Sequence, residues 1–454
     1  MDAITIGELA DVLGVDRTGL PVTDSFADVS IDSRTLQPGD VFWAIKGEQF
    51  DGHSFLPDAT KSGAKAVVVS RDCAADVSCL RVQDVQRSLR EFAGWYRGTL
   101  VGSVVGITGS VGKTTCRRMI HDVLASRYAV TQSPKNFNNH FGVPLSLLSA
   151  SVGDDYVVLE LGASAVGEIA SLAELAAPEI GVVTAIAPAH LEGFGTLADV
   201  ATAKGELVES LPELGLAALN GDDPLVRKLE SRTTAEVRFF GTNADSDVQA
   251  TNILASADEL RFEVDGNDYA LNVAGVHHLY SALAAITVGR EAGLLPAEIQ
   301  EGFDAFEPAN GRCVVKRFGR SVVIDDSYNS SPRSVAAAAE TLVQFEDHPQ
   351  RILVLGDMAE LGPDAESLHY NTGKNCALVA GVDLILAGGL FAAQFAAGAA
   401  KHNVEAIACD NVDDLMTTLR TRFNPGDAVL VKGSRSARME RVVADLEQRL
   451  SEAT

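Results

Sequence analysis

The sequence predicts an α/β protein of three domains. Its 454 residues exceed the length that one hydrophobic core usually organises. Apolar strand-like runs alternate with helical segments in two separate series, which is typical of parallel sheets covered by helices on both faces. We therefore expect a mixed α/β domain at residues 1–98, a central doubly wound parallel-sheet domain at 99–310 with a P-loop and a small antiparallel sheet, and a Rossmann-like α/β domain at 311–454.

The elements of the first two domains follow from their patterns. The N-terminal domain combines short strands and helices and ends in a helical pattern around Arg87–Arg97. The central domain is expected to contain apolar parallel strands at 104–108, 156–161, 180–187 and 216–220. Between about 235 and 275 the strands (VRFFG, ELRFEVDG, YALNVAG) shorten and alternate in polarity, which predicts the small antiparallel sheet. An Ala-rich helix is expected from His278 to Ala292.

The last domain repeats the strand–helix alternation. Its apolar strands are expected at 321–326, 351–357, 382–388 and 428–434. The stretch Ala377–Ala400 is long and apolar, but it contains Asp383, Gln394 and four glycines. It therefore predicts a strand followed by an Ala-rich helix rather than a transmembrane span.

Composition narrows the classes of partner. The chain has 37 basic and 62 acidic residues, a formal net charge of −25, which argues against non-specific binding to nucleic acid or to an anionic membrane. Six scattered cysteines without metal-site spacing predict buried free thiols, and the N-terminus lacks the basic region of a signal peptide. We expect a cytoplasmic monomer with no membrane insertion.

The most informative segment is VVGITGSVGKTTCRRM, residues 104–119. A β-branched run leads through a glycine-rich turn into a helix, and backbone N–H groups in such a turn point at phosphate oxygens. Lys113 is expected to reach the terminal phosphates of a nucleotide, and the Thr114 hydroxyl to ligate Mg²⁺. Ile107 stands where the general P-loop has its first glycine, so this is a tighter variant. The alternative is a plain turn between strand and helix. The expected cradle comprises Thr108, Gly109, Ser110, Val111, Gly112, Lys113, Thr114 and Thr115.

Two further candidates stand at the carboxyl ends of neighbouring strands. Glu160 ends YVVLE, and His190 follows the next strand. Because ligands collect at such strand ends, Glu160 is placed to hold Mg²⁺ directly or through water. Each has a simpler interpretation, a solvated acid or a loop histidine. Lys204, which we place near a helix start, is by the usual pattern solvent-facing.

In the last domain, three polar segments follow strands, at 324–332, 355–362 and 429–440. Asp326 is suited to meet a nucleotide ribose. Lys432, Ser434 and Arg435 are suited to grip a carboxylate or phosphate. Each segment is also compatible with an ordinary turn, but together they predict the rim of a site.

Taken in order, these segments resemble the Mur ligases along nearly the whole chain. The resemblance rests on DSR and KGEQFDGH, then TGSVGKTT, NFNNHFGVP and IAPAHLEGFG, then DDSYN, LGDMAELG and LVKGSR. DDSYN and LGDMAELG together are similar to the branch that adds D-alanyl-D-alanine.

The resemblance implies ATP-driven amide formation with Mg²⁺. The substrates implied are UDP-N-acetylmuramoyl-tripeptide, whose carboxylate becomes an acyl phosphate, and D-alanyl-D-alanine, whose amine displaces the phosphate. The catalytic residues implied are Lys113, His190 and Lys204, and Lys204 matches a lysine that is carbamylated in related ligases. The metal ligands implied are Thr114, Glu160 and His190.

The resemblance also distributes the remaining contacts over the domains. The N-terminal domain is expected to hold the UDP-sugar-peptide, the central domain ATP, and the C-terminal domain the dipeptide. Arg312 and Asp326 are expected to contact ATP from the C-terminal domain. The substrate residues implied are Ser33, Arg34, Asn138, Asn139, Lys432, Ser434 and Arg435.

Four positions depart from the family pattern. His278 and Ser281 replace two asparagines on the adenine side, and Ser331 and Arg333 replace an asparagine and an aspartate near the dipeptide. Two alternatives therefore stay open: a ligase adding another amino acid, of the Mur or folylpolyglutamate type, and a P-loop nucleotide-binding protein without ligase activity.

Overall fold

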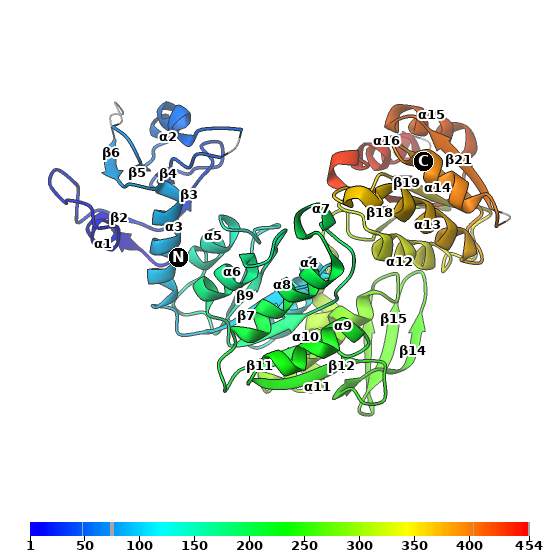
Figure 1. Ribbon diagram of the computed structural model, residues 1–454, viewed down its shortest axis with the longest axis horizontal. Coiled ribbons are helices and arrows are strands. Elements are labelled where there is room, and N and C mark those ends of the chain that lie inside the picture. The colour runs from blue at the N-terminus through cyan, green and yellow to red at the C-terminus, as the bar shows by residue number, and fades with distance from the viewer. Residues whose placement is uncertain (48, 73–76, 403, 453–454) are drawn as a thin grey trace.

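The computed structural model describes all residues except 48, 73–76, 403 and 453–454. Figure 1 shows the chain running through three successive bodies, with the N-terminal strands in blue, a central body in cyan to green, and the C-terminal body in yellow to red. Each body is built around its own sheet or sheets. The fold class predicted from the sequence is confirmed.

The N-terminal body is small and mostly parallel. Its four-stranded sheet has the order β3-β4-β5-β6, and β1 pairs with β2 in a separate antiparallel ribbon. The long helix α3 (Val85–Arg97) is capped by Asp84 and packs Phe92 on Trp43 with ring centroids 5.6 Å apart. The other elements are β1 (Ile4–Thr5), α1 (Ile6–Val12), β2 (Ser25–Phe26), β3 (Val29–Ser30), β4 (Val41–Trp43), η1 (Gly52–Phe55), α2 (Leu56–Lys61), β5 (Ala66–Val69) and β6 (Ser78–Arg81).

The central body contains a seven-stranded parallel sheet of order β13-β12-β11-β10-β7-β9-β8. Its strands are β7 (Ser103–Thr108), β8 (Val130–Gln132), β9 (Tyr156–Glu160), β10 (Ile180–Val183), β11 (Leu216–Asn220), β12 (Glu236–Gly241) and β13 (Val248–Gln249). After β9 the chain crosses to the other side of β7, so the end of β7 is the topological switch point where ligands bind in such sheets.

One strand of this region was predicted with the wrong partner. VRFFG was expected in the antiparallel sheet, but β12 pairs in parallel with β11. Its buried residues Phe239 and Phe240 extend the main core, which polarity alternation over so short a run does not reveal. The small antiparallel sheet is present, formed by β14 (Thr251–Ala255), β15 (Leu260–Val264) and β16 (Asn267–Leu271).

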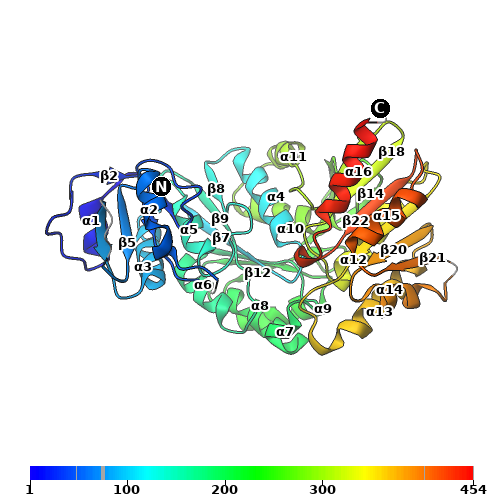
Figure 2. The ribbon, with the colours of Figure 1, turned by 90° about the horizontal axis from the view of Figure 1, so that it is seen from above.

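Helices cover both faces of the central sheet. Figure 2 shows α4, α10 and α11 on one side and α6 and α8 on the other. The helix after the glycine-rich turn buries an apolar face made of Cys116, Met119, Ile120, Val123 and Leu124, all fully buried. The helices are α4 (Lys113–Ala125), α5 (Gly142–Leu148), α6 (Glu168–Ala176), α7 (Leu191–Phe194), α8 (Leu197–Glu209), α9 (Pro224–Arg227), η2 (Lys228–Arg232), α10 (His278–Glu291) and α11 (Pro296–Ala305).

The C-terminal body has a six-stranded sheet of order β17-β18-β22-β19-β20-β21, parallel except for the edge strand β17. The four predicted strands are β18 (Ser321–Asp326), β19 (Arg351–Gly356), β20 (Leu384–Gly388) and β22 (Ala428–Lys432); the edge strands β17 (Val314–Phe318) and β21 (Glu405–Cys409) add to them. The helices are α12 (Pro332–Leu342), η3 (Gly362–Asp364), α13 (Ala365–Leu378), α14 (Ala392–Ala399), α15 (Val412–Arg422), η4 (Arg435–Ala437) and α16 (Glu440–Glu452).

The expectations about membrane spans and about free cysteines can be compared with this structure. Within the described residues, no helix has the length and apolarity needed to cross a membrane, and 377–400 contains β20 and α14 as predicted. Four cysteines are free and buried, Cys116, Cys313, Cys376 and Cys409. The expectation of free thiols is wrong for Cys79, which is disulfide-bonded, and Cys73 lies outside the described residues.

Candidate active site

The glycine-rich turn between β7 and α4 forms an open backbone cradle. Gly109 and Gly112 have φ values of 148° and 85°, in the region that favours glycine. A Cβ on Gly109 would lie 2.0 Å from Thr184 Oγ1, so this position has room for glycine alone. Gly112 is the N-cap of α4 and no side chain caps that helix start, which leaves its first N–H groups for an anion. Thr115 is the third residue of α4 and is partly exposed.

The cradle is held from both sides by the neighbouring strand ends. Thr108 Oγ1 donates to the carbonyl of Leu161 at 2.8 Å, and Ser110 Oγ donates to that of Ala187 at 2.9 Å. Thr184 Oγ1 donates to the carbonyl of Val111 at 2.6 Å. These bonds fix the loop conformation before any ligand arrives, which lowers the cost of binding.

Lys113 lies at the start of α4, with Nζ donating to the carbonyl of Gly109 at 2.7 Å. Burial lowers the pKa of Lys113, the negative charge of Glu160 opposes this shift, and the positive charge of Arg312 adds to it. Two cations from different bodies of the chain, Lys113 and Arg312, therefore act on the same region. That is the charge arrangement expected around a polyphosphate.

Glu160, at the end of β9, is buried with only 2% of its surface exposed. Its Oε2 accepts from Thr114 Oγ1 at 2.9 Å, and its Oε1 accepts from Asn138 Nδ2 at 2.8 Å. The structure thus brings together Thr114 and Glu160 and adds Asn138 to them. Asn139 is directed elsewhere, since its Oδ1 accepts from the backbone N–H of Gly142 at 2.9 Å at the start of α5.

His190 takes a left-handed backbone conformation, with φ of 53°, and precedes α7. Its Nδ1 contacts the carboxylate of Glu360, which lies in the LGDMAELG segment of the C-terminal body. His190 therefore joins the two bodies at the rim of the switch point. Glu360 was not among the predicted residues, although its segment was.

Lys204 differs from the expectation for a helical lysine. It stands in the middle of α8 rather than near its start, is 2% exposed, and its Nζ lies 5.3 Å from the ring centre of Phe194. Burial lowers the pKa of Lys204 to about 7, with the positive charge of Lys113 as the next contribution. The solvent-facing interpretation is wrong because this turn of α8 is buried, as the neighbouring Ala203 and Leu207 also are.

The C-terminal residues are largely paired with one another. Lys432 Nζ donates to Asp326 Oδ2 at 2.6 Å and to the carbonyl of Asn329 at 3.0 Å. The Arg312 guanidinium lies 4.2 Å from the ring centre of Tyr328. Ser434 is buried, whereas the side chain of Arg435 is 71% exposed. These three neighbours in sequence therefore differ in environment, since Lys432 and Ser434 are buried and Arg435 is exposed to solvent.

The N-terminal candidates lie on an exposed loop. Arg34 pairs with Asp32, with Nη2 to Oδ2 at 2.6 Å, and Ser33 is partly exposed beside it. Hydrogen bonding to Arg34 lowers the pKa of Asp32, and the charge of Lys135 in the central body lowers it further. The loop that carries Ser33 and Arg34 thus lies within electrostatic reach of the segment that carries Asn138.

Arg333, one of the departures from the family pattern, makes a contact between bodies. Its Nη1 donates to Asp223 Oδ2 at 2.9 Å, and the same carboxylate accepts from the N–H of Ile186 at 3.0 Å. Asp223 was not predicted as a site residue. Asp223 follows β11 and stands directly before Pro224 at a helix start. That position in the sequence could have identified it as a strand-end acid near the site.

Comparisons with known proteins agree with this arrangement. The chain matches the Mur ligase middle domain at 107–289, the Mur ligase glutamate ligase domain at 311–435 and the Mur ligase family catalytic domain at 26–94. It is 36% identical over 459 residues, 99% of each chain, to the UDP-N-acetylmuramoyl-tripeptide--D-alanyl-D-alanine ligase of Escherichia coli (strain K12). It is 34% identical over 92% of each chain to the Bacillus subtilis (strain 168) protein of the same name.

Solved structures give the same result. A crystal structure of MurF from Acinetobacter baumannii superposes with a TM-score of 0.90 at 28% identity, covering 99% of both chains. MurF ligase from Thermotoga maritima in complex with ADP superposes with a TM-score of 0.79 at 28% identity, covering 94% of this chain and 98% of that one. These matches show that the chain belongs to the Mur ligase family.

Proposed function

We propose that this chain is an ATP-dependent ligase that joins D-alanyl-D-alanine to UDP-N-acetylmuramoyl-tripeptide in the synthesis of the peptidoglycan precursor. The observation that carries the proposal is the pinned cradle with Lys113, facing Glu160, in a chain that resembles ligases of this name over its full length. The ADP complex of the Thermotoga maritima relative supports an ADP-forming reaction.

The residues around Glu160 fit a hard divalent cation. A carboxylate 2% exposed, bonded to the neutral donors Thr114 and Asn138, is a buried negative charge with oxygen atoms directed at the cradle. Mg²⁺ prefers such oxygen ligands and keeps several waters. Thr114 and Glu160 would hold it, and it would neutralise charge on the phosphates when bound. We assign His190 to the rim, through Glu360, rather than to this first group of ligands.

The reaction proceeds in two steps at the cradle. The tripeptide carboxylate attacks the γ-phosphorus of ATP and ADP leaves, which forms an acyl phosphate. The amine of D-alanyl-D-alanine then attacks the acyl carbon, phosphate leaves, and an amide with one released proton is formed. The chain contributes positioning and charge: Lys113 and Arg312 stabilise the transferring phosphoryl group. The contacts His190–Glu360 and Asp223–Arg333 link the two bodies, and closure of the bodies around the substrates would keep water from the acyl phosphate.

Lys204 is suited to carbamylation. Its pKa of about 7 leaves a large neutral fraction at neutral pH, and the neutral amine is the form that adds CO₂ to give a carbamate and a proton. A carbamate would replace a positive charge near Lys113 by a negative one. We propose that this anion supports the cation site beside Glu160.

The remaining roles follow the three bodies. We assign the UDP-sugar-peptide to the N-terminal body through Ser33 and Arg34, ATP to the central body, and the dipeptide to the C-terminal body through the segment at Lys432. We expect the enzyme to work in the cytoplasm as a monomer. Analytical ultracentrifugation would give its mass in solution.

The test is an acceptor assay on the purified protein. With ATP and Mg²⁺, phosphate release is expected only when both UDP-N-acetylmuramoyl-tripeptide and D-alanyl-D-alanine are present, and tripeptides ending in diaminopimelate or lysine are compared. Release with glutamate or a single diamino acid as acceptor would favour a different ligase of the family. Release without any amine, or binding of ATP without turnover, would refute the ligase assignment.

A further inference from the structure

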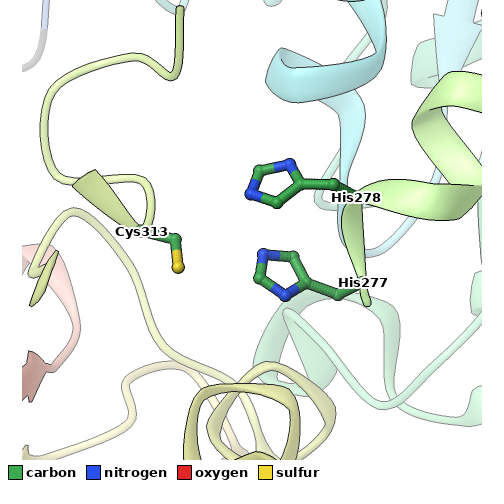
Figure 3. A group of neighbouring side chains, drawn as sticks. All are labelled: His277, His278 and Cys313. Carbon is green, nitrogen blue, oxygen red and sulfur yellow. The ribbon is translucent and has the colours of Figure 1, made fainter. Parts of the chain in front are cut away.

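A compact group of metal-ligating side chains lies between the central and C-terminal bodies. His277 and His278 stand at the start of α10, and Cys313 directly precedes β17. Their ligand atoms all lie within 4.8 Å of one another. Figure 3 shows both imidazoles extending from the helix start toward the Cys313 sulfur, which approaches from a different segment of the chain.

The group has unused ligand capacity. His278 is 1% exposed, and neither of its ring nitrogens has a hydrogen-bond partner among the described residues. Leaving such polar atoms buried and unpaired destabilises the folded state. His277 has only a long contact, Nδ1 to Thr341 Oγ1 at 3.4 Å, and Cys313 Sγ has one to the Ala274 carbonyl at 3.7 Å. A bound ligand would satisfy all three side chains at once.

The surroundings keep the imidazoles neutral, which is their coordinating form. Burial lowers the pKa of His277 to about 4, opposed by Asp326, with Lys432 contributing in the same direction as burial. Burial also holds the pKa of His278 well below its usual range. The charged groups acting on the cluster, Asp326 and Lys432, form an ion pair with each other, so both are already partnered.

The donor set selects the class of cation. Two imidazole nitrogens and one cysteine sulfur suit Zn²⁺, whereas Mg²⁺ and Ca²⁺ require oxygen ligands. Burial raises the pKa of the Cys313 thiol, so the thiolate forms as the metal binds. Ligand atoms of a tetrahedral zinc site lie about 3–4 Å apart, so side-chain movements of about 1 Å would close this group around an ion. Binding would release one proton from the Cys313 thiol as the Zn–S bond forms.

We propose that His277, His278 and Cys313 form a Zn²⁺ site that links the start of α10 to the start of β17, with water as fourth ligand. The site is separate from the Mg²⁺ group at Glu160 in both its residues and its ligand chemistry. The ion would thereby connect the central body, which contains α10, to the C-terminal body, which contains β17.

The test is metal binding by the full chain after removal of metals with a chelator. Titration with Zn²⁺ against a chromophoric chelator is expected to reveal one tight equivalent per chain, and Co²⁺ is expected to give a sulfur-to-cobalt charge-transfer band. Zn²⁺ is also expected to raise the melting temperature, because it binds the native state. Mg²⁺ at the same concentration should neither compete with the chromophoric chelator as a tight equivalent nor give the charge-transfer band.

Two variants test the ligands, and a third serves as control. Cys313→Ser and His278→Asn are expected to lose the tight equivalent, the cobalt band and the thermal shift. Cys376→Ser, which removes another buried free thiol, is the matched control and is expected to retain all three. His278→Asn restores the residue usual in the family, so it should fold even if Cys313→Ser does not. The absence of a tight equivalent in the unaltered chain, or its survival in either ligand variant, would overturn the proposal.

Discussion

Polar residues lie at the carboxyl ends of the strands in both the central sheet and the C-terminal sheet. The two sets of residues differ in whether their charged side chains form ion pairs with each other. At the central edge, Glu160 is bonded to the neutral groups of Thr114 and Asn138, and Lys113 is bonded to a backbone carbonyl. At the C-terminal edge, Lys432 pairs directly with Asp326. In the same sheet, Asp357 accepts two backbone N–H groups, from Leu390 and Phe391.

This difference distinguishes residues that act on the reacting groups from residues that stabilise the fold. Charges that form no direct ion pair among the described residues are available to a polyphosphate and its cation, whereas charges already paired hold their own strands together. We therefore expect substitutions at the central edge to affect the chemical step, and substitutions at the C-terminal edge to affect stability first.

Lys113→Ala is expected to lower ligation by about 1000-fold, because one preorganised charge at the transferring phosphoryl group contributes on the order of 3–4 kcal/mol. The melting temperature should change little, since the one hydrogen bond of the ammonium within the described part of the chain is to the carbonyl of Gly109. The measurement is phosphate release with both substrates. Lys228→Ala, an exposed lysine of the same body, serves as control and should retain full activity. Equal losses in both variants would contradict the role of Lys113.

Glu160→Gln is expected to lower activity by about 100-fold and to raise the Mg²⁺ concentration needed for half-maximal rate, because an amide binds the cation more weakly than a carboxylate does. Activity is measured as a function of Mg²⁺ at saturating ATP. The exposed Glu213 provides the matched Glu→Gln control. An unchanged Mg²⁺ dependence in Glu160→Gln would place the cation elsewhere.

Lys432→Met is expected to destabilise the fold by about 2 kcal/mol, less than the ~3–5 kcal/mol of a fully buried pair, because Asp326 retains some solvent contact. Urea unfolding gives the value. The double variant with Asp326→Asn should regain most of the stability, since no buried charge is then left alone. If the single and double variants are equally unstable, the Lys432–Asp326 pair is not the cause.

The lowered pKa of Lys204 predicts that the free energy of unfolding depends on pH. Its pKa of about 7 in the folded state lies below the usual 10.5, so the cost of burying the charge is fully present below pH 7. Between pH 7 and 10 the unfolded chain binds the extra proton, and stability should rise by about 1.4 kcal/mol per pH unit from this group. The measurement compares urea unfolding of the protein and of Lys204→Met in CO₂-free buffer. The difference between the two curves should shrink with rising pH; parallel curves would show that Lys204 titrates normally.

The central edge could be predicted from sequence to a greater extent than the C-terminal one. Its cradle is continuous from Thr108 to Thr115, and local backbone conformation is encoded by glycine spacing and by the apolar face of α4. The C-terminal residues were identified as strand-end groups, but the pairing of Lys432 with Asp326 joins β22 to β18 across more than a hundred positions. Spacing carries no information about such a contact.

The sequence alone determined most of the parallel strands, though not the pairing of β12, together with the phosphate-binding turn and the acid at the end of β9. These features depend on residue order and on short-range backbone geometry. Folding in three dimensions decided the burial of Lys204, the contacts of His190 with Glu360 and of Asp223 with Arg333, and the meeting of His277 and His278 with Cys313. Each of these depends on which distant segments exclude water from one another. That exclusion sets the lowered pKa of Lys204 and leaves His278 without a hydrogen-bond partner among the described residues.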